Sequence, residues 1–199
     1  MSDKKSYIER DFEETSRNLG KPELAASMKK LLAVLLAENT GAPKKEMFHL
    51  KAQILPAIAA YKTLCAVMEK DAAYKTVYGY VKKNAEKRRK SFEKFVKIPG
   101  AYKIIPWMFT KGTKIAFNEE AGFARREIKT SGGVWRIDMT KCPYHDFCAK
   151  YGCQELCAPF CDSDDICYTD LHPNLLWHRE KTLGRGGDCC DFCLKIKGR

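Results

Sequence analysis

Cysteine is the residue type whose distribution in this sequence most suggests chemistry. The 199-residue chain has ten cysteines, and nine of them lie between residues 142 and 193. Six fall in the stretch CPYHDFCAKYGCQELCAPFCDSDDIC and three in GDCCDFC. Thiols at this density can form disulfides, bind a metal, act as nucleophiles or fill a core as small apolar groups.

The cellular compartment decides between disulfides and free thiols. The N-terminal sequence MSDKKSYIERDFEE is charged and lacks the apolar region of a secretory signal. No apolar run is long enough to cross a bilayer. We therefore expect a cytoplasmic protein with no membrane partner, in which reductants keep the thiols reduced. Metal binding and thiol chemistry are therefore better explanations of the cysteines than disulfides are.

Metal binding is supported by the number of cysteines more than by their spacing. The only CxxC is Cys190–Cys193, in a strand-like segment whose alternation would point the two thiols to opposite faces. No cofactor is therefore certain, although zinc or an iron–sulfur cluster is possible on these grounds. Its ligands would come from Cys142, Cys148, Cys153, Cys157, Cys161, Cys189, Cys190 and Cys193.

A reactive thiol is the other chemical interpretation, and Cys161 is a candidate. Cys153, Cys157 and Cys161 are four residues apart, so they would stack on one face of a helix, but Pro159 argues against an uninterrupted helix. The acidic residues that follow Cys161 oppose thiolate formation, so a cation must compensate. Arg179 is one candidate for that cation, and His178 is another. Among histidines, His145 in CPYHDFC is the one to test as a ligand.

The first 117 residues predict helices. Apolar residues recur at three- and four-residue steps over residues 22–41 and 47–70, with a kink expected at Pro56 and Cys65 on the core-facing stripe. A third helix is expected over residues 72–97. The chain carries a net charge of +11, and its basic residues are dense in residues 81–97. No recognition motif accompanies them, so we expect a solvated helix face and no nucleic-acid partner.

The remaining residues, 118–199, predict strands. Alternating apolar and polar residues mark GFARREIKT, VWRIDMT, LLWHREKTL and DCCDFCLKI. In the last of these, Cys190 shares a core-facing side with Phe192 and Leu194, whereas Asp191 lies on the other side. We predict a single α+β domain over residues 1–199, in which N-terminal helices pack on a C-terminal antiparallel sheet of about four strands. Short cysteine-rich helices lie between the two hairpins.

Four stretches resemble the L-2-amino-thiazoline-4-carboxylic acid hydrolase family. They are ILPAIAAYKTL, VWRIDMTKCPY, CQELCAPFCDSDD and LLWHREKTLGRGGDCCDF, and the resemblance covers roughly residues 45–195. The C-terminal combination of Cys-Asp, Arg-x-x-Thr-Leu-Gly and Cys-Asp-Phe is its most specific part. The additional thiols depart from the family pattern, so the same scaffold could instead carry a metal-binding or thiol redox protein.

The resemblance implies hydrolytic opening of a C–N bond in a small cyclic amidine or thiazoline amino acid, on a route to cysteine. It assigns Cys161 as nucleophile or site-lining thiol, Asp165 and Asp191 as acid and base, and Arg179 as the clamp for the substrate carboxylate. Thr182 would donate a hydrogen bond. Cys190 belongs to the matched motif, although its strand periodicity directs it into the core.

A purely structural interpretation of the same residues stays open. TLGRGGDCCDF is also typical of a hairpin with glycine turns, and Arg179 is equally suited to a structural ion pair with Asp165 or Asp191. The sequence leaves the substrate, the oligomeric state and the identity of any nucleophile undecided.

Overall fold

The N-terminal part of the chain folds into helices, as the spacing of its apolar residues predicts. The computed structural model describes residues 6–130 and 132–198. Its helices are α1 (Tyr7–Asn18), α2 (Glu23–Glu38), α3 (Lys44–His49), α4 (Leu55–Cys65), α5 (Lys70–Val96), α6 (Ile105–Ala116), α7 (Pro143–Lys150) and α8 (Cys157–Tyr168).

Helices α3 and α4 are joined by a π-helical turn, Leu50–Ile54, so that the chain is helical without a break from Lys44 to Cys65. The irregularity lies just before Pro56, which has no N–H to donate to the preceding turn. The kink expected at Pro56 therefore takes the form of a widened turn. This turn sets the direction of His49 and Gln53, both of which line the cavity described below.

The C-terminal part forms a four-stranded antiparallel sheet with the order β1-β2-β4-β3. The strands are β1 (Ala124–Glu127), β2 (Val134–Lys141), β3 (Leu175–His178) and β4 (Cys190–Ile196). Trp135, Ile137 and Met139 of β2 are buried, whereas Arg136 between them is exposed. The sheet is thus covered on one face only, which explains the period-two pattern of its sequence.

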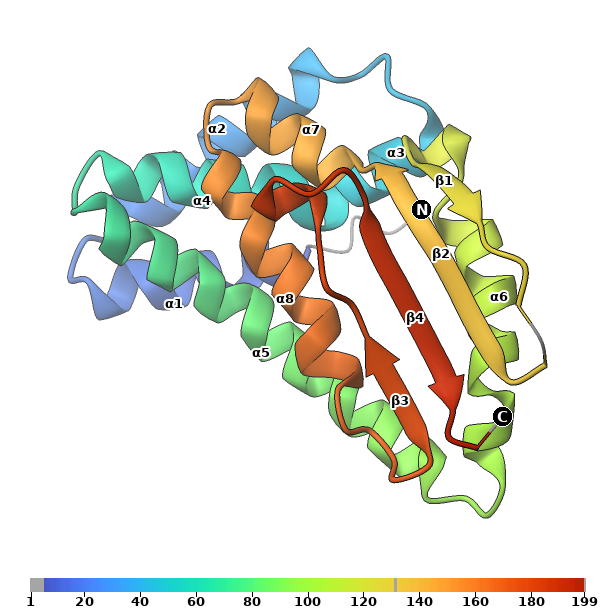
Figure 1. Ribbon diagram of the computed structural model, residues 1–199. Coiled ribbons are helices and arrows are strands. Elements are labelled where there is room, and N and C mark those ends of the chain that lie inside the picture. Colours follow the sequence, from blue (N-terminus) through green and yellow to red (C-terminus); the bar gives the residue numbers. More distant parts are fainter. Residues whose placement is uncertain (1–5, 131, 199) are drawn as a thin grey trace.

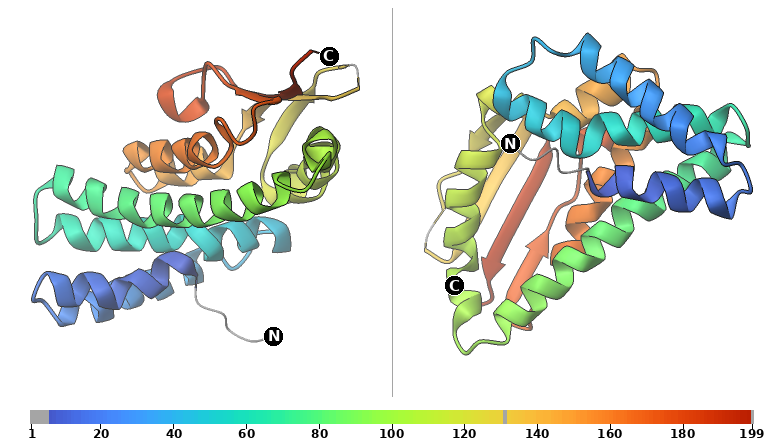
Figure 2. Two further views of the ribbon diagram at one scale, coloured as in Figure 1. Left: turned by 90° about the horizontal axis from the view of Figure 1, so that it is seen from below. Right: turned by 180° about the vertical axis from the view of Figure 1, so that it is seen from behind.

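The sheet lies on one side of the molecule and α1 and α2 on the other, with α4 and α5 between them (Figures 1 and 2). Helix α8 packs along α5, and α6 packs against β2 and β4. Buried side chains from α1 through β4 form a continuous core. The α+β class predicted from the sequence is confirmed. Within the described residues, no helix is long and apolar enough to cross a membrane.

Two local predictions are corrected. Cys65 is exposed, because it ends α4 and the neighbouring Leu64 takes the buried position. The expected strand over residues 175–183 ends at His178, and the chain then forms a loop and a 3₁₀ turn, Leu183–Arg185. Arg179 and Thr182 therefore lie on this loop. Ser131 of the expected SGG turn lies outside the described residues.

Candidate active site

Helix α8 presents a row of polar side chains to the interior of the protein. Cys157, Cys161, Asp164 and Tyr168 are four, three and four residues apart, so they share one face, and all four line the same cavity. Pro159 lies within the first turn of α8, where proline is tolerated. Of the three thiols expected to stack on one helix face, Cys157 and Cys161 do, whereas Cys153 precedes the helix.

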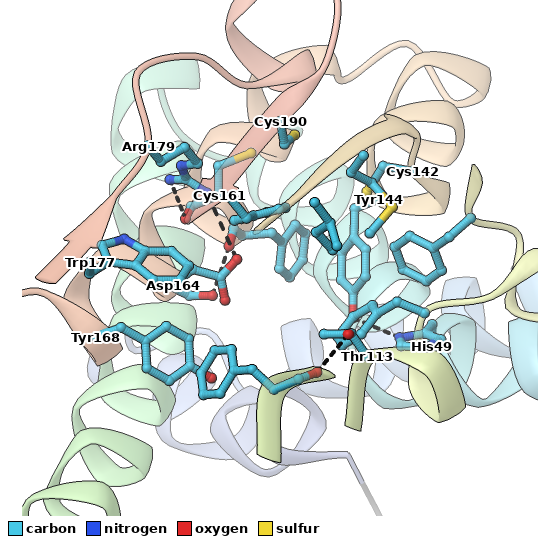
Figure 3. Close-up of a pocket in the computed structure, with 18 of the residues that line it drawn as sticks. His49, Thr113, Cys142, Tyr144, Cys161, Asp164, Tyr168, Trp177, Arg179 and Cys190 are labelled. Atoms are coloured by element: carbon cyan, nitrogen blue, oxygen red, sulfur yellow. Dashed lines mark hydrogen bonds and ion pairs between the residues drawn. The ribbon is translucent and has the colours of Figure 1, made fainter. Parts of the chain in front are cut away.

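The cavity lies between α8 and the covered face of the sheet and has a volume of about 180 Å³. That is the volume of roughly six water molecules, or of one small metabolite. Arg179, Cys161 and Asp164 lie together at one end, and His49, Tyr144 and Cys142 at the other (Figure 3). Most of the wall between them is aromatic: Phe109, Phe117, Phe123, Trp135, Phe160, Tyr168, Trp177 and Phe192.

Cys161 has the environment of a reactive thiol. The neighbouring Cys157 thiol, the nearby Thr182 side chain and the charge of Arg179 together lower the pKa of Cys161 to about 7, against the opposing effects of burial and Asp164. The same interaction raises the pKa of Cys157, and burial of this thiol acts in the same direction. Arg179 is therefore the compensating cation. His178 instead lies at the surface, 3.4 Å from Glu180.

Asp164 is the second titratable group at this end of the cavity. Burial raises its pKa from 3.8 to about 6, although the charges of Arg179 and Arg88 act in the opposite direction. Its side chain keeps 31 % of its accessible surface, and this surface faces the cavity. A carboxyl group of this kind changes protonation near neutral pH and can both accept and return a proton.

Arg179 is held firmly, with only 2 % of its side-chain surface exposed. Its Nη2 donates to the backbone oxygen of Cys161 (3.0 Å) and to Asp165 Oδ2, and Asp165 Oδ1 accepts a hydrogen bond from Trp177 Nε1 (2.8 Å). Arg179 Nη1 is 3.8 Å from Asp164 Oδ2 and is buried without a hydrogen-bond partner among the described residues. One donor of this guanidinium therefore remains for a ligand.

Arg88 is a functional candidate that sequence reasoning missed. It comes from the basic stretch of α5, whose side chains were expected to be solvated, yet it lines the cavity and its Nη2 donates to Ser163 Oγ (3.2 Å). Its buried Nε has no acceptor within the described part of the chain. The neighbouring Arg89 donates to the carbonyls of Ile166 and Thr169 at the end of α8. The expectation of a solvated face is thus wrong for these two arginines.

His49 and Tyr144 form the polar group at the other end of the cavity. His49 Nε2 lies 3.1 Å from the carbonyl oxygen of Ala116, which can only accept, so Nε2 carries the hydrogen. Nδ1 then accepts a hydrogen bond from the Tyr144 hydroxyl at 3.1 Å. Burial lowers the pKa of His49, which keeps the ring neutral at pH 7. His145, by contrast, lies at the surface beside Asp146.

The loop after β3 brings further predicted residues to the site. Thr182 is 3 % exposed, and its buried Oγ1 has no hydrogen-bond partner within the described residues. Cys190 lines the cavity, and its sulfur accepts a hydrogen bond from the backbone N–H of Leu183 (3.3 Å). Cys190 can point toward the core and still belong to the site, because the covered face of the sheet is also a wall of the cavity. Burial raises the pKa of Cys190 to about 11.

Asp191 lies away from the cavity. It is on the opposite face of β4, where its Oδ1 accepts hydrogen bonds from the backbone N–H groups of Glu180 and Lys181 (3.1 and 2.8 Å). These bonds fix the loop that carries Arg179 and Thr182. Of the six residues assigned from the sequence, the structure brings Cys161, Arg179, Thr182 and Cys190 together, and it places Asp165 behind Arg179.

Gly184 allows this loop to approach the two thiols of α8. A Cβ at this position would lie 2.7 Å from Cys157 Sγ and 3.1 Å from Cys161 Sγ. We expect Gly184→Ala to displace the thiol pair, to destabilise the fold by about 1–3 kcal/mol and to slow alkylation of Cys161 at pH 7. Urea unfolding and iodoacetamide kinetics measure these effects.

Gly79→Ala in α5 is the matched control, since a Cβ there meets nothing within 4 Å. It should leave both quantities unchanged or raise stability slightly. A Gly184→Ala protein with unaltered Cys161 reactivity would show that the close packing of loop and thiols is not needed for the low pKa.

All ten cysteines are free thiols in the structure. Two of them, Cys148 and Cys153, form a second hydrogen-bonded pair, away from the cavity wall. In residues 6–130 and 132–198, no group of three or more histidine, cysteine, aspartate or glutamate side chains is arranged to hold a metal ion. The eight cysteines named as possible ligands do not converge on one point.

Comparison with known proteins identifies the family of this chain. A family model described as L-2-amino-thiazoline-4-carboxylic acid hydrolase matches residues 47–194, which include every residue of the cavity wall named above. Searches of curated proteins and of solved structures gave no significant match. The family match spans most of the chain, from within α3 to β4. The protein therefore belongs to the L-2-amino-thiazoline-4-carboxylic acid hydrolase family.

Proposed function

We propose that this protein hydrolyses a C–N bond in a small cyclic amidine such as L-2-amino-thiazoline-4-carboxylate. The observation that carries the proposal is the pairing, in one small cavity, of a thiol whose pKa is lowered with a carboxyl group whose pKa is raised. Family membership supports a hydrolase with a small-molecule substrate. The cavity volume fits a ligand of that size.

The charges around the cavity suit such a substrate. A protonated cyclic amidine is a flat cation, for which the aromatic wall and the Asp164 carboxylate offer complementary contacts. The substrate carboxylate needs donors, and the unused Nε of Arg88 and Nη1 of Arg179 supply two of them. Because Arg179 Nη2 is already engaged, Arg179 contributes a single hydrogen bond in this proposal and does not form a bidentate clamp.

In the proposed reaction, the Cys161 thiolate adds to the ring carbon between sulfur and nitrogen, and the C=N electron pair moves to nitrogen. Asp164 relays a proton from the exocyclic amine to the ring nitrogen, and the ring C–N bond breaks. Water, deprotonated by Asp164, then adds to the same carbon, and the electron pair of the remaining C=N bond moves to the exocyclic nitrogen, which takes the proton from Asp164. The hydroxyl proton passes to Asp164 and on to the free amine as the C=O bond forms and the bond from carbon to the Cys161 sulfur breaks. The Cys161 thiolate leaves, and the product is cysteine carrying a carbamoyl group on its sulfur. Removal of that group by another enzyme would release cysteine.

The other predicted residues take supporting roles in this proposal. The hydroxyl group of Thr182, which has no partner within the described residues, is free to donate to the Cys161 thiolate. Asp165 holds Arg179, and Asp191 shapes the loop that carries Arg179 and Thr182. The neutral thiol of Cys190 lines the cavity. The resemblance assigned Asp165 and Asp191 as acid and base. In this proposal Asp164 takes both roles, because it faces the cavity.

A substrate comparison tests the proposal. The purified protein should convert L-2-amino-thiazoline-4-carboxylate into a product heavier by one water molecule, as seen by mass spectrometry. The analogue with a ring carbonyl, 2-oxothiazolidine-4-carboxylate, is neutral where the amidinium is charged, so we expect it to react at least about 10²-fold more slowly. No ring opening of any cyclic amidine, or equal rates for the two compounds, would contradict the proposal.

A further inference from the structure

Helix α6 and the turn before it expose a row of large apolar side chains. Ile104, Trp107, Met108 and Ile115 share one face of the helix at spacings of three, one and seven residues, and Ile98 lies just before this segment. Their exposed fractions are 48 % for Ile104, 61 % for Trp107, 36 % for Met108 and 70 % for Ile115. We call these four residues and Ile98 the α6 outer face.

The α6 outer face is not needed for the core. The opposite side of the helix buries Ile105 and Pro106 and contributes Phe109 and Thr113 to the cavity wall. The helix runs along the margin of the sheet, and its outer side is turned away from the other helices (Figure 2). An exposed tryptophan and three other exposed apolar side chains in one row form a contiguous apolar patch, and such patches on a protein surface mark interaction sites.

The charged residues in the chain segment that carries this face all have the same sign. Lys97, Lys103, Lys111 and Lys114 occur in the segment from residue 95 to residue 118, which contains no aspartate or glutamate. Lys114 pairs with Glu127, whereas the other three form no ion pair within the described residues. Lys97, Lys103 and Lys111, in the same segment as the apolar row, are thus left for a partner.

We propose that the α6 outer face docks on an anionic lipid surface. Tryptophan and isoleucine side chains enter the boundary between headgroups and acyl chains, and lysines at the edges of such a helix reach the lipid phosphates. A second copy of this chain is a poorer partner, because a symmetric contact would bring the same lysines against each other. The contact would be peripheral, since no described helix crosses a bilayer.

Vesicle sedimentation tests this proposal with the intact protein. We expect binding to phosphatidylcholine vesicles that contain about a third phosphatidylglycerol, no binding to pure phosphatidylcholine, and a decline as salt is raised. The double variant K103E/K111E should bind at least about fivefold more weakly for each lysine replaced. Trp107→Ser with Ile115→Ser should also lose binding. Fluorescence of the wild-type protein should shift to shorter wavelength with anionic vesicles, because Trp107 is the exposed tryptophan, whereas Trp135 and Trp177 are buried.

The matched control is K30E/V34S in α2, which changes an exposed lysine and an exposed valine on the layer farthest from the sheet. It should bind as the wild type does. If the control variant lost as much vesicle binding as the α6 variants, binding would reflect general attraction between a basic protein and anionic lipid, and the proposal would be overturned. Absence of wild-type binding to anionic vesicles at low salt, or a solution dimer abolished by Trp107→Ser, would overturn it too. All α6 variants should keep ring-opening activity, so this test is independent of the proposed reaction.

Discussion

Replacing Cys161 by alanine is expected to lower the rate of ring opening by about 10³-fold or more, because the attacking atom is lost. The fold should survive, since Cys161 is only partly buried and alanine is a good helix former. Steady-state kinetics with L-2-amino-thiazoline-4-carboxylate, together with thermal unfolding, measure both effects.

Two other thiols serve as controls for this variant. Cys190→Ala changes a cavity-lining thiol whose raised pKa keeps it protonated, and we expect less than about a tenfold loss of activity. Cys193→Ala lies outside the cavity wall, so it should leave the rate unchanged. If Cys190→Ala were inactive and Cys161→Ala active, the two thiols would exchange their proposed roles.

Asp164→Asn is expected to lose about 10²-fold or more in rate and yet to unfold at a higher temperature near pH 8. The activity is lost because asparagine cannot relay a proton. The stability rises because the folded protein holds a carboxyl group whose pKa is raised from 3.8 to about 6 by burial. A buried negative charge at neutral pH costs stability, and the neutral asparagine removes that cost.

The sign follows from proton binding in the two states. Between about pH 4 and pH 6 the unfolded chain has released the Asp164 proton while the folded protein retains it, so wild-type stability falls as the pH rises through this range. Above this pH range, the buried Asp164 carboxylate lowers the stability by its full amount. The gain for Asp164→Asn should be about 1 kcal/mol at pH 8, allowing for the 31 % of its surface open to the cavity, and should vanish below pH 4. A constant gain at both pH values would contradict a raised pKa.

Much of the fold follows from patterns that depend on local geometry. The alternation in VWRIDMT correctly predicts which side of β2 is buried, because strand side chains alternate between faces whatever the partner strand. The helical stripe over residues 47–70 predicts α3 and α4, but it does not reveal the π-helical turn that directs His49 and Gln53 into the cavity. One extra residue in a turn changes the direction of every side chain in it.

The site residues that were missed had weak sequence signals for physical reasons. In DSDD, the choice between Asp164 and Asp165 depends on where α8 begins, and Pro159 obscured that start. Asp164 and Asp165 follow Cys161 by three and four residues, so helical spacing alone does not choose between them. Arg88 stands among lysines and arginines with the same charge and similar spacing, and only its packing against α8 takes it out of solvent. Local periodicity in the sequence does not predict which distant elements pack against each other.

The most direct test of the central claim, that Cys161 attacks the ring carbon, is mass spectrometry of protein acid-quenched during the first turnovers with L-2-amino-thiazoline-4-carboxylate. The proposed reaction predicts a fraction of chains that carry the added mass of one whole substrate, located on the peptide that contains Cys161 and absent in Cys161→Ala. Turnover without any adduct, or an adduct on another cysteine, would contradict it.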